Sequence, residues 1–96
     1  MNKYETIVII KSDISKSKDQ ETINKIRDKI NEYGEVIEEQ DMGIRKMAYE
    51  VEKNSNGHFY VIRYKISESK SQEAIRELER CLRITDEVLK YLPIKI

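Results

Sequence analysis

The sequence has little of what secreted, metal-binding or membrane-inserted proteins need. Its 96 residues include one cysteine, one histidine, one proline and three glycines. A single thiol cannot form an internal disulfide, so a reducing, cytoplasmic compartment fits best. There is no apolar stretch of about 18 residues and no N-terminal signal-peptide pattern, so we expect neither a membrane span nor a leader.

An excess of charge of one sign is also missing. The 18 basic and 18 acidic residues give a formal net charge of zero, although charged residues make up 38% of the chain. Nucleic-acid-binding proteins are usually basic overall. An RNA-binding role would therefore need a local basic patch, or a partner protein that supplies positive charge.

The length and the apolar content indicate one folded domain, residues 1–96. Hydrophobic residues make up 39% of the chain and recur periodically, which is not the composition of a disordered tail. A chain of this length buries a modest core and leaves little room for a deep catalytic cavity.

Residues that commonly carry catalysis are isolated in this sequence. His58 and Cys81, each the only residue of its type, are too far apart along the chain for a metal-ligand motif. We interpret His58, on the buried face at a strand end, as a packing residue without an orienting partner, and Cys81 as a small core residue. Gly34, Gly43 and Gly57 form no glycine-rich phosphate loop. The sequence therefore predicts no enzyme, no metal site and no cofactor.

The hydrophobic periodicity predicts six elements. Alternating apolar residues indicate strands at 3–11, 35–53, 58–66 and 87–96. Apolar residues at three- and four-residue spacing indicate helices at 19–33 and 69–82. This order is typical of the α+β class: a ferredoxin-like βαββαβ sandwich, with a four-stranded antiparallel sheet and two helices on one face.

Several local signals refine the boundaries of these elements. Gly34 is expected to end the first helix in a left-handed conformation. Asn54–Gly57 is expected to form a hairpin turn, and a slip in the pattern at Asp41–Gly43 indicates a bulge. A capping box is expected to start at Ser69. Pro93 lacks an amide donor, which predicts that the last strand lies at an edge of the sheet.

The first and third strands, which are central in this fold, each carry two apolar rows. The bulkier rows are expected to face the helices: Tyr4, Thr6, Val8, Ile10, Tyr60, Ile62, Tyr64 and Ile66. The opposite rows place four large apolar side chains on the open face: Ile7, Ile9, Phe59 and Val61. Exposed apolar patches usually mark interaction surfaces, so we predict a partner-protein interface there. The alternative is that these are scattered surface residues without a partner.

Basic residues form two candidate RNA-binding spots. Arg45 and Lys46 follow Gly43 on the extended hairpin, and other strand lysines can add to this spot. A second spot lies on the outer side of the second helix, where interleaved acidic residues make a solvated face the alternative. The predicted RNA-binding residues are Lys3, Arg45, Lys46, Arg83 and Lys90.

The third strand can also be compared with that of an RNA-recognition module, which shares this element order. That strand carries a basic residue, a glycine and aromatic residues at set positions. Gly57, Tyr60 and Val61 agree with the pattern, whereas Phe59 and Arg63 do not. A single-stranded RNA-recognition module is therefore the alternative function.

The hairpin segment Gly43-Ile44-Arg45-Lys46-Met47-Ala48-Tyr49 resembles the Gly-x-Arg-x-Leu-Ala-Tyr stretch of the bacterial small-subunit ribosomal protein six family. Further similar segments follow in order over nearly the whole chain: Lys3-Tyr4-Glu5, Tyr33-Gly34, Lys53, Gly57-His58-Phe59 and Ile84-x-Asp86-x-Val88. Their order and spacing together make the resemblance specific.

This resemblance implies a ferredoxin-like fold and a structural, non-catalytic role on the cytoplasmic ribosome. It implies binding to the central domain of small-subunit ribosomal RNA as a heterodimer with ribosomal protein eighteen, a basic partner that would offset the zero net charge. Three features depart from the family. Glu50 stands where proline is usual, and Leu89-Lys90 holds one base where two are common. The chain ends at Ile96 without the tail of many members, so we expect no tail contacts to the partner.

Overall fold

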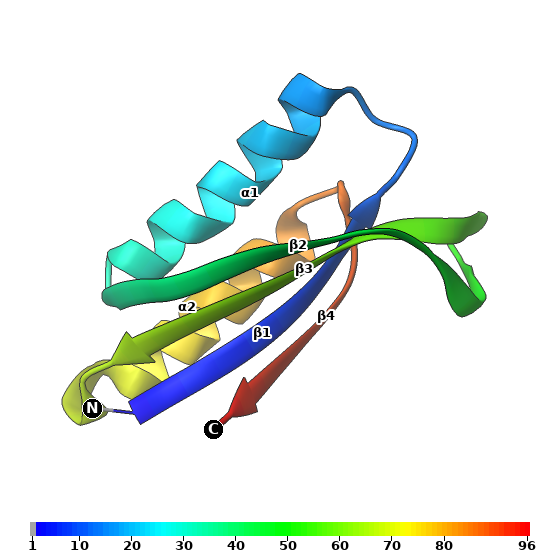
Figure 1. Cartoon of the computed structure of the whole chain (residues 1–96). Coiled ribbons are helices and arrows are strands. Elements are labelled where there is room, and N and C mark those ends of the chain that lie inside the picture. Colours follow the sequence, from blue (N-terminus) through cyan, green and yellow to red (C-terminus); the bar gives the residue numbers. More distant parts are fainter. Residues whose placement is uncertain (1) are drawn as a thin grey trace.

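The computed structural model describes residues 2–96 and contains a four-stranded sheet and two long helices (Figure 1). The elements in chain order are β1 (Asn2–Lys11), α1 (Lys16–Asn31), β2 (Gly34–Val51), β3 (Asn54–Ile66), the 3-10 helix η1 (Glu68–Lys70), α2 (Ser71–Ile84) and β4 (Val88–Lys95). This order confirms the predicted ferredoxin-like βαββαβ arrangement.

The sheet is antiparallel throughout and has the spatial order β2-β3-β1-β4. β1 and β3 are therefore central, and β2 and β4 are the edge strands. Both helices lie on the same face of the sheet, and in the described chain the opposite face is left open (Figure 1). Pro93 lies in edge strand β4, as predicted, where a residue without an amide donor is tolerated.

Helix α1 begins earlier than predicted, at Lys16 rather than Asp19. The reason is an N-cap at Ser15, whose Oγ accepts a hydrogen bond from the Lys18 amide at 3.2 Å. The helix then buries one face against the sheet, made of Thr22, Ile23, Ile26 and Ile30. The three isoleucines belong to the apolar stripe that the sequence predicts, whereas its fourth member, Tyr33, lies beyond the end of the helix and is partly buried.

Helix α2 follows η1 and starts at Ser71, and the predicted capping box at Ser69 is wrong. Ser69 lies inside η1, and neither η1 nor α2 has a side-chain cap. The Ser71 hydroxyl instead donates to the carbonyl of Ser67 at 3.0 Å, which fastens the start of α2 to the preceding turn. Within residues 2–96, no helix combines the length and the apolar character needed to span a membrane.

The core lies between the helices and one row of β1 and β3. The whole row predicted to face the helices is buried, with exposed fractions of 8% or less: Tyr4, Thr6, Val8, Ile10, Tyr60, Ile62, Tyr64 and Ile66. Two hydroxyls enter this core, and the Thr6 and Tyr64 hydroxyl oxygens hydrogen-bond to each other at 2.7 Å. Cys81 is buried, as expected for a small core residue.

Gly34 has a different role from the predicted one. The glycine with a left-handed φ is Gly43, not Gly34. Gly34 opens β2 opposite Ile66, and a Cβ atom on Gly34 would lie 2.2 Å from the carbonyl oxygen of Lys65. Glycine stands there because the backbone of β3 passes too close for any side chain.

The turn between β2 and β3 is formed by Glu52 and Lys53, so its predicted position at Asn54–Gly57 is wrong. Glu52 and Lys53 have φ values of 47° and 65°, and two consecutive left-handed residues are typical of a tight hairpin turn. Asn54–Gly57 belongs to β3. A Cβ atom on Gly57 would lie 2.3 Å from Cγ2 of Ile9, so this glycine allows close strand packing and does not reverse the chain.

β2 and β3 continue past the ends of β1 and β4 as a hairpin arm, which we define as residues 44–56. The predicted bulge is confirmed at its base, where the β2–β3 register shifts between Asp41 and Gly43. Gly43 has a φ of 82°, and its amide donates to Oδ1 of Asp41 at 2.8 Å. Beyond this bend the arm turns away from the helices (Figure 1).

Gly34→Ala should lower the free energy of unfolding by about 2–3 kcal/mol, because the added methyl group meets a backbone carbonyl that cannot move aside. Gly43→Ala is the matched control. Nothing lies within 4 Å of the Cβ position at Gly43, so only the cost of a left-handed alanine, about 1 kcal/mol, is expected. Urea unfolding measures both variants. A loss at Gly34 no larger than that at Gly43 would show that β3 does not constrain this position.

Candidate protein and nucleic-acid interfaces

The four predicted partner-contact residues form two adjacent cross-strand pairs on the open face. Ile7 pairs with Val61, and Ile9 pairs with Phe59. All four side chains are half-buried. On β4, Leu92 pairs with Ile7 and is 55% exposed, which widens the apolar surface toward that edge. These five residues are called the open-face patch below.

Two hollows border the open-face patch, so this surface is not flat. One of about 330 Å³ lies over β1 and β4 and is lined by Ile7, Ile9, Lys90, Tyr91 and Leu92. The other, of about 300 Å³, lies between the patch and the arm and is lined by Ile9, Phe59, Lys90, Val51 and arm residues 46–49. The arm thus forms a wall beside an apolar floor, and Ile9 and Lys90 belong to both hollows.

A contact between Tyr49 and Lys90 ties the arm to β4 across the open face. The Lys90 ammonium lies 4.4 Å from the centre of the Tyr49 ring and donates a hydrogen bond to the Tyr49 hydroxyl. Tyr49 is nevertheless 61% exposed, so its ring is accessible at the rim of the hollow.

The five predicted RNA-binding residues are all exposed, but the structure does not bring all of them together. Lys46 and Lys90 line the same hollow, and Arg45 lies next to Lys46 on the arm. Lys3 pairs with Lys65, at the opposite end of β1. Arg83 lies in the last turn of α2, in the helix layer. We call Arg45, Lys46 and Lys90 the basic rim. Lys46 and Lys90 border the open-face patch and Arg45 adjoins Lys46 on the arm, whereas Lys3 and Arg83 lie apart.

Paired charges occupy the open face at the end of the sheet away from the arm. Arg63 lies 2.7 Å from Glu38 on β2 and 3.7 Å from Glu5 on β1. Lys65 lies 3.5 Å from Glu35. These charges largely satisfy one another, so the apolar surface has a neutralised border on this side and a basic border on the arm side.

His58 has two carboxylate partners, which corrects its interpretation as a packing residue without an orienting partner. Its Nδ1 lies 2.8 Å from Oδ2 of Asp19, and its Nε2 lies 2.6 Å from Oδ1 of Asp41, both within hydrogen-bond distance. Its ring stacks on that of Tyr60, with the centres 4.4 Å apart, and the Tyr60 hydroxyl donates to Asp19. No local pattern could reveal this cluster, because its members come from α1, β2 and β3.

The surroundings of His58 shift the pKa values of the cluster in consistent directions. Burial alone would lower the pKa of His58, but the hydrogen bonds to Asp41 and Asp19 outweigh burial and hold this pKa above its ordinary value. Burial alone would raise the pKa of Asp41, but hydrogen bonds from His58 and the Gly43 amide hold it below the usual range. These two shifts favour a charged imidazolium beside a charged Asp41 carboxylate.

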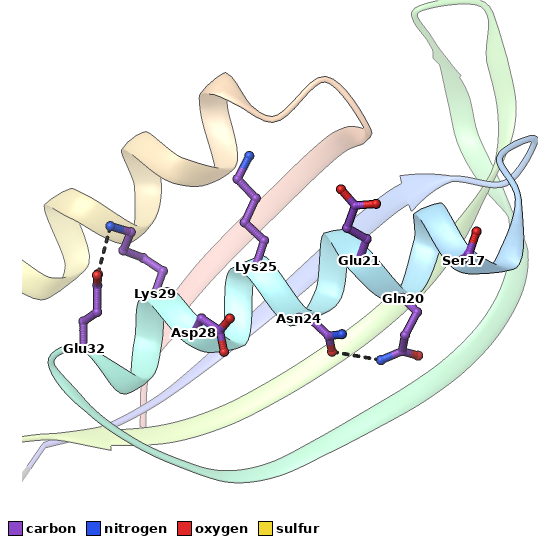
Figure 2. A pocket seen from close by; sticks show the side chains of 8 residues that line it. All are labelled: Ser17, Gln20, Glu21, Asn24, Lys25, Asp28, Lys29 and Glu32. Carbon is purple, nitrogen blue, oxygen red and sulfur yellow. Dashed lines mark hydrogen bonds and ion pairs between the residues drawn. The ribbon is translucent and has the colours of Figure 1, made fainter.

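The outer face of α1 carries a shallow hollow of about 640 Å³ that has no features of a site (Figure 2). Its polar side chains point outward and pair with one another: Gln20 donates to Asn24 at 3.0 Å, and Lys29 lies 2.9 Å from Glu32. It is a solvated helix face. Across residues 2–96, no group of three or more histidine, cysteine, aspartate or glutamate side chains could hold a metal ion.

The aromatic residues of β3 do not form the stacking surface of an RNA-recognition module. Tyr60 and Tyr64 are buried on the helix side of the sheet. Phe59 alone among the aromatic residues of β3 lies on the open face, and it is half-buried. Base stacking requires exposed aromatic faces, so the geometry disfavours this alternative.

Comparisons with known proteins agree with the fold and with the family that the sequence resembles. A model of the family described as ribosomal protein S6 matches residues 3–95. Small ribosomal subunit protein bS6 of Sulfurovum sp. is 40% identical over 96 residues, which cover 99% of this chain and 72% of that protein. The protein of the same name from Alkaliphilus oremlandii is 31% identical over 100% of this chain and 98% of its own length.

A solved structure gives the same result in three dimensions. The crystal structure of 30S ribosomal protein S6 from Thermotoga maritima matches with a TM-score of 0.89 and 25% identity, over 99% of this chain and 87% of that one. Family match, curated relatives and solved structure all extend over nearly the full length of residues 1–96. The chain therefore belongs to the ribosomal protein S6 family of the small ribosomal subunit.

Proposed function

We propose that this protein, acting as one domain over residues 1–96, is a non-catalytic component of the small ribosomal subunit that binds the central domain of its ribosomal RNA as a heterodimer with ribosomal protein eighteen. The observation that carries this proposal is the open-face patch, an apolar surface that the chain's own helices leave uncovered in residues 2–96. Family membership supplies the expected RNA and the expected partner.

The open-face patch has the build of a protein-binding surface. Its centre is the Ile9–Phe59 pair. Ile9 lines both hollows and Phe59 lines one of them, so a partner side chain can bind in a hollow next to the aromatic ring. Protein interfaces typically combine an apolar, aromatic-rich centre with a polar rim. Here the rim is the basic rim on one side and the paired charges of Arg63 and Lys65 on the other.

The zero net charge favours RNA binding as part of a complex. Affinity for RNA depends largely on the neutralisation of phosphates, and a protein with no net charge gains little from this by itself. A basic partner on the open-face patch would lie directly beside the basic rim. RNA could then contact both proteins along their shared border, where Arg45 and Lys46 project from the arm.

Phe59→Ala should weaken binding to ribosomal protein eighteen by about 2 kcal/mol or more, roughly 30-fold in Kd, because an aromatic anchor at the centre of the patch is lost. Ile84→Ala is the control, since Ile84 is 67% exposed at the end of α2 and away from the patch. Titration calorimetry with the purified partner measures both variants. Equal affinity of wild type and Phe59→Ala would place the partner elsewhere.

Arg45→Ala combined with Lys46→Ala should weaken binding of the heterodimer to a central-domain RNA fragment and reduce its salt dependence, since phosphate contacts are lost. Stability should change by about 0.5 kcal/mol or less, because both side chains are exposed. Lys25→Ala with Arg80→Ala, which removes the same charge from the helix layer, is the control. Filter binding across a salt series measures all three proteins. If the arm variant had the same salt slope as the wild type, Arg45 and Lys46 would be excluded as phosphate contacts.

A further inference from the structure

His58 connects three segments that are far apart in the sequence. On one side its Nδ1–H donates to Asp19 Oδ2 in the first turn of α1, and on the other its Nε2–H donates to Asp41 Oδ1 in β2. An ionised carboxylate can only accept hydrogen bonds, so both ring nitrogens must carry protons. With Asp19 and Asp41 both ionised, the ring is an imidazolium shared between the helix layer and the edge of the sheet.

Asp41 is the residue through which this connection reaches the arm. The same carboxylate oxygen that accepts from His58 also accepts the Gly43 amide at 2.8 Å. This bond closes the bend at which the β2–β3 register shifts and Gly43 takes its φ of 82°. Within the bend, Nε of Arg45 donates to the carbonyl of Met42 at 3.1 Å.

Asp19 provides the fixed end of the connection. Its second oxygen accepts the hydroxyl hydrogen of Tyr60, a buried residue of the core, and the Tyr60 ring also stacks on the imidazole. Asp19 belongs to α1 and lies on the same face as Thr22, Ile23 and Ile26, the face that packs against the sheet. Of the two carboxylates, Asp19 is thus fastened to the core, whereas Asp41 is exposed and belongs to the bend.

We propose that His58, which bridges Asp19 and Asp41, is a positioning residue for the arm: it fixes the bend at Asp41–Gly43 and thereby the orientation of the strand that carries Arg45 and Lys46. The importance of this direction for RNA rests on the proposed function. The inference about the arm itself depends only on the contacts of His58, Asp19 and Asp41.

The connection has a defined pH window. The charged and titratable groups around His58 are Asp19 and Lys16 from α1, Asp41 and Glu39 from β2, and Tyr60 from β3; Ile10 faces it from β1. Glu39 is paired with Arg27 at 2.7 Å. Because the pKa of His58 is raised, the stability that the imidazolium gives to the bend is complete at low pH. This stability is lost as pH rises through the pKa of His58. Because the pKa of Asp41 is lowered, the stability that its carboxylate gives to the bend is lost only as pH falls through the pKa of Asp41.

A titration followed by NMR tests the inference directly, because the sequence contains one histidine and its imidazole signals need no assignment. The imidazole should titrate with a midpoint above about 6.5. The amide signals of Gly43, Ile44 and Arg45 should shift with the same midpoint. Asp41→Asn should lower the midpoint and weaken this coupling, whereas Tyr60→Phe, which leaves the Asp41 side intact, should preserve it. Arm amides that stay in place while the imidazole titrates would overturn the inference.

The RNA readout separates this inference from the proposed function. For the heterodimer with ribosomal protein eighteen, Kd for a central-domain RNA fragment should rise about tenfold between the protonated and the neutral state of His58, the size of one weakened charge-assisted contact. His58→Gln should bind weakly at every pH, with any dependence due to the partner alone. Unchanged wild-type affinity across the midpoint would refute the role in RNA positioning. No RNA binding at any pH would contradict the proposed function, and the coupling of arm amides to His58 would still decide the inference.

Discussion

The pairing of β1 with β3 determines which side chains enter the core and which stay available on the other face. In the observed register, Thr6 stands opposite Ile62 in the buried rows, and Ile7 stands opposite Val61 in the open ones. A slip by one residue would exchange the two faces of a strand. The buried hydrogen bond between the Thr6 and Tyr64 hydroxyls favours this register, because a one-residue slip would place the two groups on opposite faces of the sheet and break the bond.

The open face acquires its shape from the arm, which depends in turn on that central pairing. β1 ends at Lys11 opposite Gly57, so β2 and β3 continue without a neighbour and are free to bend. The bend brings Lys46 and Tyr49 beside Ile9, Phe59 and Lys90. An apolar floor and basic side chains therefore share a border, which suits a protein that joins a partner to RNA. This agrees with the expected place of the chain on the cytoplasmic ribosome of a bacterium.

The sequence was sufficient for features that repeat along one element. Period-two alternation predicted both rows of β1 and β3, and the order of elements predicted the fold. Features that depend on two segments meeting could not be predicted. Gly34 was predicted to end a helix and Gly57 to form a turn, yet each is required by a strand that passes close by. The partners of His58, Asp19 and Asp41, come from elements that are separate in the sequence. The sequence around His58 therefore could not show that this residue has carboxylate partners.

The predicted RNA-binding residues show the same limit. Arg45 and Lys46 are adjacent in sequence and stay adjacent in space, whereas Lys90 joins their neighbourhood only because β4 lies beside β1. Lys3 is likewise on β1, but at its opposite end. The sequence could identify exposed basic residues, but it could not show which of them share a surface.

The central claim is that the open-face patch receives the partner protein. Methyl NMR during titration with ribosomal protein eighteen tests it most directly, because isoleucine, valine and leucine methyls report on both faces of the sheet. The account predicts that the methyl signals of Ile7, Ile9, Val61 and Leu92 shift, while that of Ile26, buried in the core with 0% exposure, keeps its position. A complex that forms without changing the four patch signals would contradict it.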